Sequence, residues 1–287
     1  MQEKKRGRMH SRWLLPAALV LAGAAWFENF TLSTSTVTAA CAALPEAFSG
    51  LRIVQISDLH GRRFDAESRY LLELVRLQSP DLIALTGDLA DEFTDFSMLP
   101  PLLDGLTALA PTFYVTGNHE WVLSREKREA LFSMLDAAGV VRLQNEYRLL
   151  KKGQASIVLA GVDDPNGPYD QKRPAQLVRE IRQSRGRDAY ILMLSHRNDE
   201  LDLWANMGVQ TVLCGHGHGG IVRLPFVGAV FGTHLDLFPD YTAGLYRKGQ
   251  TSMIVSRGLG GSRKLPLRIG NRPEIVTVIL KAESGKV

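Results

Sequence analysis

The sequence predicts an α/β fold, and three observations carry this prediction. Between residues 51 and 214, apolar runs of strand length alternate with stretches that have the apolar spacing of helices. The apolar runs are too continuous for half-exposed strands, which indicates strands buried on both faces. Polar residues follow the ends of five runs, where an open α/β sheet keeps its ligands. The length of 287 residues is enough to bury a sizeable core.

The first half of the body is expected to form, in order, an edge strand at 31–38, a strand at 51–57, a helix at 67–78, a strand at 81–86, a helix between 95 and 109, a strand at 111–115 and a helix from Ser124. In the 67–78 segment, apolar residues recur at helical spacing. The adjacent Pro100 and Pro101 leave the start of the next helix open. Gly139 suits the left-handed cap that ends the last one.

The second half is expected to begin with a β-hairpin, because strands at 147–150 and 156–160 flank a turn at Lys151-Lys152-Gly153. A helix at 174–183, a strand at 189–194, a helix at 199–207 and a strand at 210–214 follow. The remainder is β-rich, with strands expected at 243–248, 251–256 and 274–280. The chain has no repeat, linker or low-complexity stretch. We therefore expect one domain at 31–287, after an N-terminal segment at 1–30.

The formal net charge of +4 belongs to the N-terminal tail. The first twelve residues contain Lys4, Lys5, Arg6, Arg8 and Arg12 against the single acidic Glu3, so the rest of the chain is neutral. A nucleic-acid surface needs basic residues clustered on the folded domain. No nucleic-acid partner is therefore expected.

An uncharged apolar run at 14–27 follows this basic tail. As a helix it would reach roughly 21 Å, which is short of the roughly 30 Å hydrocarbon core of a bilayer. We favour an uncleaved anchor that continues to Phe30 and has Trp13 and Trp26 at its interfaces. A cleavable signal peptide, cut near Ala22-Gly23-Ala24, is the alternative. An interfacial amphipathic helix is least favoured, because no polar face is present.

Both leading interpretations place the body on the extracytoplasmic side of the cell membrane, because positive charges that precede an apolar segment stay in the cytoplasm. The alternative to a membrane-held protein is one exported after signal cleavage. Cys41 and Cys214 could form one disulfide or remain two thiols, and Cys214 is expected in the core.

Five polar clusters follow the buried strands: Asp58-Leu59-His60, Gly87-Asp88, Gly117-Asn118-His119-Glu120, Ser195-His196 and Gly215-His216-Gly217-His218. The first three are spaced by 30 residues, as successive βαβ units are, so they are expected along one sheet edge. A single Asp or His in such a place is usually a cap or a core residue. Convergence of all of them on one edge predicts a metal site instead.

Imidazoles mixed with carboxylates suit Zn, Mn or Fe rather than Ca or Mg. Two Asp, one Asn and four His side chains would supply seven ligands, which are too many for one ion. The clusters resemble the calcineurin-like metallophosphoesterase superfamily, whose motifs D-x-H, G-D, G-N-H-E/D, H and G-H-x-H all occur in this order between residues 56 and 219. The N-terminal segment, Gly219-Gly220, the 241–244 stretch and the 256–260 stretch resemble its bacterial membrane-associated branch. Many members place a Pro two residues after the fourth-motif His, where this chain has Asn198.

The resemblance implies a layered sandwich of two mixed β-sheets flanked by helices, with two divalent metal ions. The implied first site consists of Asp58, His60 and His218, and the implied second site of Asn118, His196 and His216. Asp88 would bridge the two ions. The implied chemistry is hydrolysis of a phosphoester or pyrophosphate bond by a bridging hydroxide. His119 would contact the phosphate or protonate the leaving group, and Glu120 is expected to be structural.

Two arginines, Arg197 and Arg257, are candidates for substrate contacts, although a solvated side chain is the favoured interpretation of Arg197. We leave Asp163, Asp164 and His234 out of the ligand set. The G-x-G-x-x-G pattern at 215–220 is not taken as a dinucleotide site, because no good helix follows it.

The expected substrate is a phosphorylated small molecule or lipid, and the expected membrane contact is the N-terminal segment. An envelope-facing body argues against cytoplasmic nucleotide-sugar lipids as substrates. The alternative function is a non-catalytic, metal-stabilised binding module or scaffold at the membrane. The complete ligand set favours the enzyme.

Overall fold

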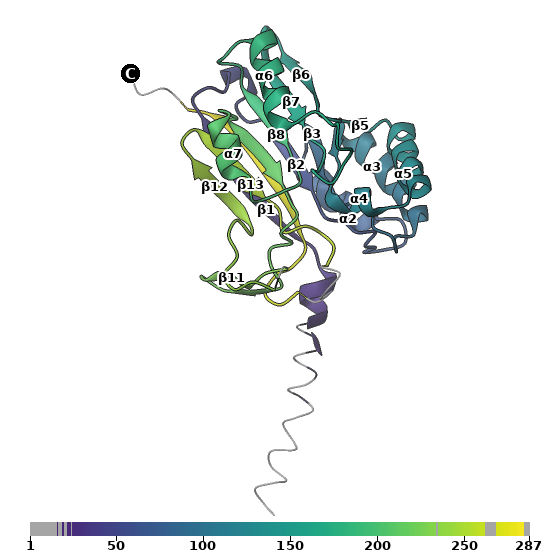
Figure 1. Cartoon of the computed structure of the whole chain (residues 1–287). Helices are drawn as coiled ribbons and strands as arrows, with labels where there is room; N and C mark the ends of the chain where they lie inside the picture. Colours follow the sequence, from purple (N-terminus) through teal and green to yellow (C-terminus); the bar gives the residue numbers. More distant parts are fainter. Residues whose placement is uncertain are drawn as a thin grey trace, which may run out of the picture.

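Two six-stranded sheets form the centre of the body (Figure 1). The computed structural model describes residues 16, 19, 22, 23, 25–233, 235–261 and 268–283. The first sheet has the order β1 (Ser33–Cys41), β14 (Glu274–Ala282), β2 (Arg52–Ile56), β3 (Leu82–Thr86), β4 (Thr112–Val115) and β5 (Val141–Arg142). The second has the order β12 (Gly244–Lys248), β13 (Thr251–Val255), β9 (Thr211–Cys214), β8 (Ile191–Leu194), β7 (Ala155–Gly161) and β6 (Glu146–Lys152).

Both sheets are mixed. In the first, β2 to β5 run parallel, whereas β14 is antiparallel to β2. In the second, β7, β8, β9 and β13 run parallel, and β6 and β12 pair antiparallel at the two edges. A separate hairpin consists of β10 (Val222–Leu224) and β11 (Gly228–Phe231). The predicted α/β class with two mixed sheets is therefore confirmed.

Helices cover the outer face of each sheet (Figure 1). The first sheet carries α2 (Arg69–Leu77), α3 (Leu99–Leu109) and α5 (Arg125–Ala137), and the second carries α6 (Pro174–Arg185) and α7 (Leu201–Asn206). Short turns of helix lie at η1 (Glu46–Phe48), η2 (Phe96–Met98) and α4 (Asn118–Val122). The inner faces of the two sheets pack together in a core that includes Ile53, Leu192 and Leu213. Buried strands of this kind have apolar residues on both faces, which explains their continuous apolar runs.

The predicted helices and strands are found within a few residues of their expected ends. Ser124 caps α5 by accepting the Lys127 N–H, and Gly139 after the helix has φ +77°. The structure corrects the hairpin turn, because Lys151 and Lys152 still pair with β7 and the reversal lies at 153–154. Among the described elements, five were not predicted: η1, β5, α4, β10 and β11. Two of them are a two-residue strand and a single helical turn, too short for a periodic pattern.

The two cysteines are free, buried thiols, so the disulfide alternative is wrong. Part of the predicted membrane segment at 14–30, namely residues 14, 15, 17, 18, 20, 21 and 24, lies outside the described residues, and residues 25–30 are helical. Within the part of the chain that the structure describes, no helix is both long enough and apolar enough to cross a bilayer.

Candidate metal centre

The five polar clusters converge because parallel strands from both sheets end in the same place. The first three follow β2, β3 and β4, which are neighbours in the first sheet, as the 30-residue spacing predicted. The other two follow β8 and β9 of the second sheet. The expectation of a single sheet edge is wrong, and the site lies where the ends of two packed sheets meet. The backbone N–H of His216 donates to the Asp58 carboxylate at 3.0 Å and joins the two sheets.

Tight turns direct the site residues away from their strands. Five of these residues have left-handed backbones, with φ between +48° and +66°: Asp58, His60, Asp88, His216 and His218. Residues with a Cβ rarely adopt this backbone conformation because it is strained, and strained residues of this kind are concentrated at functional sites. Close packing requires glycine at position 215, because a Cβ there would lie 2.2 Å from the Asp58 carboxylate.

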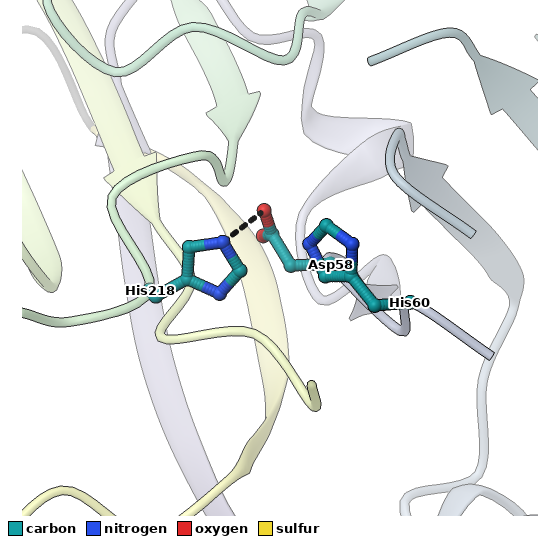
Figure 2. A group of neighbouring side chains, drawn as sticks. All are labelled: Asp58, His60 and His218. Carbon is teal, nitrogen blue, oxygen red and sulfur yellow. Dashed lines mark ion pairs between the residues drawn. The ribbon is translucent and has the colours of Figure 1, made fainter. Parts of the chain in front are cut away.

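The first group consists of Asp58, His60 and His218, each with a ligand atom within 4.8 Å of the others. Figure 2 shows the Asp58 carboxylate between the two imidazoles, with Nε2 of His218 at 3.7 Å from Oδ1. Both ring nitrogens of His60 and Nδ1 of His218 are buried and have no hydrogen-bond partner. Such orphaned polar atoms are costly in a folded protein unless a ligand satisfies them. The group therefore fits a metal ion.

Burial lowers the pKa of His218 to about 3, against the opposing charge of Asp58 and with a further lowering from His60. A neutral imidazole is the form that binds a metal. His218 therefore has the required protonation state at neutral pH.

The second group consists of Asp88, His196 and His216. His196 Nδ1 lies 2.9 Å from the Thr86 carbonyl, so this nitrogen carries the proton and Nε2 is the available ligand atom. Within 3.2 Å of that Nε2 lie Oδ2 of Asp88, Oδ1 of Asn118 and Nδ1 of His216. Burial, followed by the charge of His196, lowers the pKa of His216 to about 2.

Asp88 lies between the two groups. Its Oδ2 atom is 3.6 Å from Nε2 of His60 and 3.2 Å from Nε2 of His196. Burial opposes its ionisation, but the adjacent His196 lowers the pKa of Asp88 well below its usual range. One charged oxygen thus faces a histidine of each group, which is the geometry that a bridging ligand requires.

The carboxylate of Glu120 holds the turn that carries Asp88. Its Oε2 accepts the N–H groups of Asp88 and Gly117 at 3.0 and 2.7 Å, and its Oε1 accepts that of Leu89 at 2.7 Å. Glu120 is fully buried, and burial together with the charge of Asp88 raises its pKa to about 7. These bonds give Glu120 the structural role that was expected of it.

His119 lies at the first turn of α4, half-buried beside the metal groups. Its ring meets that of His60 edge to face at 4.7 Å, and its backbone N–H donates to Oδ1 of Asp88 at 2.9 Å. One of its ring nitrogens lies within 4.8 Å of ligand atoms of His60 and Asp88. His119 is therefore close enough to touch a substrate held between the groups, and a ligand role also fits this distance.

The two candidate arginines differ in position. Arg197 forms a bidentate pair with Asp164, at 2.6 and 3.1 Å, and its Nη1 lies 3.0 Å from Nε2 of His216. The favoured interpretation of Arg197 as a solvated side chain is therefore wrong. Arg257 pairs through two nitrogens with Glu274, at 3.0 and 3.1 Å, and thereby ties its loop to β14. Substrate contact by either arginine stays a prediction.

Two further carboxylates lie near the site; Asp91 was missed in the sequence, and Asp164 was considered but left out of the ligand set. Asp91 lies 3.7 Å from Nδ1 of His60, where it can orient the ring, as carboxylates behind metal-binding imidazoles do. Asp164 orients Arg197. The only sequence signal for Asp91 was its place three residues after Asp88. His234 lies outside the described residues.

A cleft of about 520 Å³ adjoins the second group. Its lining includes Arg197, Asp199 and His216, together with Asp236 and Asp240 from the loop after β11. A molecule bound there would reach the metal groups at His216.

Comparisons with known proteins identify the family of this chain. The profile of the calcineurin-like phosphoesterases matches residues 51–220. The chain is 31% identical over 267 residues to the uncharacterized metallophosphoesterase YkuE of Bacillus subtilis (strain 168), covering 90% of this chain and 89% of that protein. It is 31% identical over 234 residues to phosphodiesterase YaeI of Escherichia coli (strain K12), covering 80% and 82%.

A protein of Danio rerio, named transmembrane protein with metallophosphoesterase domain, is 27% identical over 253 residues, which are 83% of this chain and 55% of that protein. The profile match spans more than half of the chain, and the two bacterial relatives align over most of their length. The five ordered motifs and these matches lead to one conclusion: the chain belongs to the calcineurin-like phosphoesterase family.

Proposed function

We propose that this protein is a metal-dependent phosphoesterase that uses two divalent ions to hydrolyse a phosphoester or pyrophosphate bond of a membrane-associated substrate. One observation carries the proposal: Oδ2 of Asp88 faces both His60 and His196. The name of the Escherichia coli relative supports phosphodiester hydrolysis. The name of the Danio rerio relative supports a membrane setting.

The donor set supports two metal sites. Asp58, His60 and His218 would hold the first ion, and the second group together with Asn118 would hold the other, with Asp88 shared. When bound, two such ions lower the pKa of a shared water towards neutrality and neutralise charge on the phosphoryl oxygens. The nitrogen and oxygen donors suit Zn, Mn or Fe.

The remaining residues act on the substrate or on the ligands. His119 would donate a proton to the leaving group or contact a phosphoryl oxygen, since it lies beside both groups. Asp164 accepts hydrogen bonds from Nε and Nη2 of Arg197, and Nη1 points towards His216. Arg197 would therefore face a phosphoryl oxygen near His216. Glu120 would keep Asp88 in place through backbone hydrogen bonds.

The leaving group would occupy the cleft beside His216. Three carboxylates, Asp199, Asp236 and Asp240, line this cleft together with Arg197. Carboxylates accept hydrogen bonds from hydroxyl and amino groups. The cleft therefore fits a polar head group rich in such donors.

Hydrolysis of bis(p-nitrophenyl) phosphate by the full-length protein tests the proposal. We expect turnover with Mn²⁺ and a loss on the order of a hundredfold or more in Asp88→Asn, because this change removes a charged shared ligand. The matched control is Asp202→Asn, whose side chain is 66% exposed and pairs with Lys248 on the surface. Absence of turnover with Mn²⁺, Zn²⁺ and Fe²⁺ alike would refute the enzyme and favour a binding module.

A further inference from the structure

One end of the molecule displays an apolar surface that the core does not use. We name it the apolar rim, and it consists of Leu224, Phe226, Val227, Leu235, Leu237 and Phe238. Phe226 is fully exposed, and the other five are between 49% and 69% exposed. Monomeric soluble proteins rarely expose apolar side chains in such groups unless the surface binds something.

The two segments of the apolar rim are held together by backbone pairing. The first is the tip of the β10–β11 hairpin, and the second is the loop that follows it. Phe231 of β11 forms a β-bridge with Leu237, and the N–H of Phe238 donates to the carbonyl of Val230 at 3.0 Å. The rim is therefore one built surface.

The backbone is strained to present these side chains. Phe226, Leu235 and Phe238 have φ values of +66°, +66° and +51°. Bulky residues with left-handed backbones are outliers that persist only where the structure or its function requires them. Burial does not explain them, because all three side chains are more than half exposed.

The end of the N-terminal helix lies at the same end of the molecule. Figure 1 shows the helix at residues 25–30 and β11 at the lower end of the body. Asn29 exchanges two hydrogen bonds with the backbone of Arg268, at 2.9 and 3.1 Å, and the neighbouring Ile269 forms a β-bridge with Val222 of β10. The residues at 268 and 269 thus connect the N-terminal helix to the hairpin.

The sequence before the helix at residues 25–30 indicates what covers the rim. An uncharged apolar run at 14–27 follows the basic tail, and this pattern favours a segment that lies in a bilayer. On the helix itself, Trp26 and Phe30 are 61% and 57% exposed. Aromatic side chains of this kind favour the boundary between the bilayer and water. If the apolar run lies in a bilayer, the rim beside its end lies at the bilayer surface.

The same loop borders the catalytic cleft. Asp236 and Asp240 line the cleft, and Leu235, Leu237 and Phe238, which lie in the same stretch of the loop, are exposed. We propose that the apolar rim docks into the lipid bilayer and turns the cleft beside His216 towards the membrane surface, so that the head group of a lipid can enter it. The part of this proposal that concerns the substrate rests on the phosphoesterase function proposed above, whereas docking itself does not.

Depth-dependent fluorescence quenching tests docking. The full-length protein would be reconstituted into vesicles of phosphatidylethanolamine and phosphatidylglycerol, with an environment-sensitive dye on Phe226→Cys or, separately, on Leu237→Cys. The control is Gln154→Cys, exposed at the β6–β7 turn, at the opposite end of β7 from the metal centre. Unsubstituted protein treated with the dye measures any labelling of the buried Cys41 and Cys214.

Lipids that carry a nitroxide quencher near the head group are expected to reduce the fluorescence at positions 226 and 237 and to leave that at 154 unchanged. Equal fluorescence at all three positions would overturn the proposal. Shielding of the dyes at 226 and 237 from water without lipid quenching would also overturn it, because a protein would then cover the rim. The experiment needs no turnover, and repeating it with Asp88→Asn separates docking from catalysis.

Discussion

The Glu120 carboxylate accepts the backbone N–H of Asp88 at 3.0 Å, inside a pocket that excludes solvent. Replacing Glu120 by Gln puts an NH₂ donor opposite backbone N–H groups, so at least one of them loses its acceptor. An unsatisfied buried group costs about 1 to 3 kcal/mol. We expect a lower melting temperature and weaker metal retention in Glu120→Gln. Glu129→Gln, at an exposed ion pair, is the control and should leave both unchanged.

The shared position of Asp88 predicts metal content. Asp88→Ala should release both ions, because its Oδ2 faces a histidine of each group. His218→Ala should release only the first, since its neighbours in that group are Asp58 and His60. Metal analysis of the purified variants checks the difference. Equal metal content in the two variants would contradict the assignment of Asp88 to both sites.

His119 is predicted to act on the substrate rather than to bind a metal. His119→Ala should retain its metal, while turnover of a phosphodiester falls on the order of a hundredfold or more, as expected when a general acid is removed. Metal analysis and rate measurements on the same sample check this. Loss of one ion would instead assign His119 to the group that it forms with His60 and Asp88.

Glu200 predicts a pH dependence of stability. Burial, followed by the charge of Asp199, raises the pKa of Glu200 to about 7 from its ordinary 4.5. The folded protein therefore binds this proton more tightly than the unfolded chain, and the associated stability is lost as pH rises from about 4.5 through about 7. Relative to the wild type, Glu200→Gln should gain about 1 to 3 kcal/mol at pH 8 and much less at pH 5.

Thermal unfolding of wild type and Glu200→Gln at the two pH values measures this difference. Glu67→Gln, whose carboxylate is 64% exposed, is the control and should show no such pH dependence. A Glu200→Gln effect of the same size at pH 5 and pH 8 would assign the effect to packing rather than to charge.

The orientation of the chain remains a prediction that fusions can test. The basic tail before the apolar run predicts that the C-terminus lies outside the cytoplasm. A C-terminal fusion to alkaline phosphatase, which needs an oxidising compartment, should be active in bacterial cells, and a fusion to green fluorescent protein should be dark. The opposite pattern would place the domain in the cytoplasm.

The sequence by itself determined which segments are buried strands and which residue types follow them. Strands covered on both faces are mostly apolar, so β2, β3 and β8 are visible as short apolar runs. The order of Asp58, Asp88, Asn118, His196 and His216 along the chain was sufficient to predict the family and to name candidate metal ligands.

Only the tertiary structure decided how these residues meet. The division of the clusters between two sheets, the pairing of Arg197 with Asp164 and the place of Asp91 behind His60 are contacts between different elements, which leave no local pattern. The apolar rim was invisible for a related reason: its hairpin is short and its side chains face outward, so no alternation of buried and exposed positions identifies it.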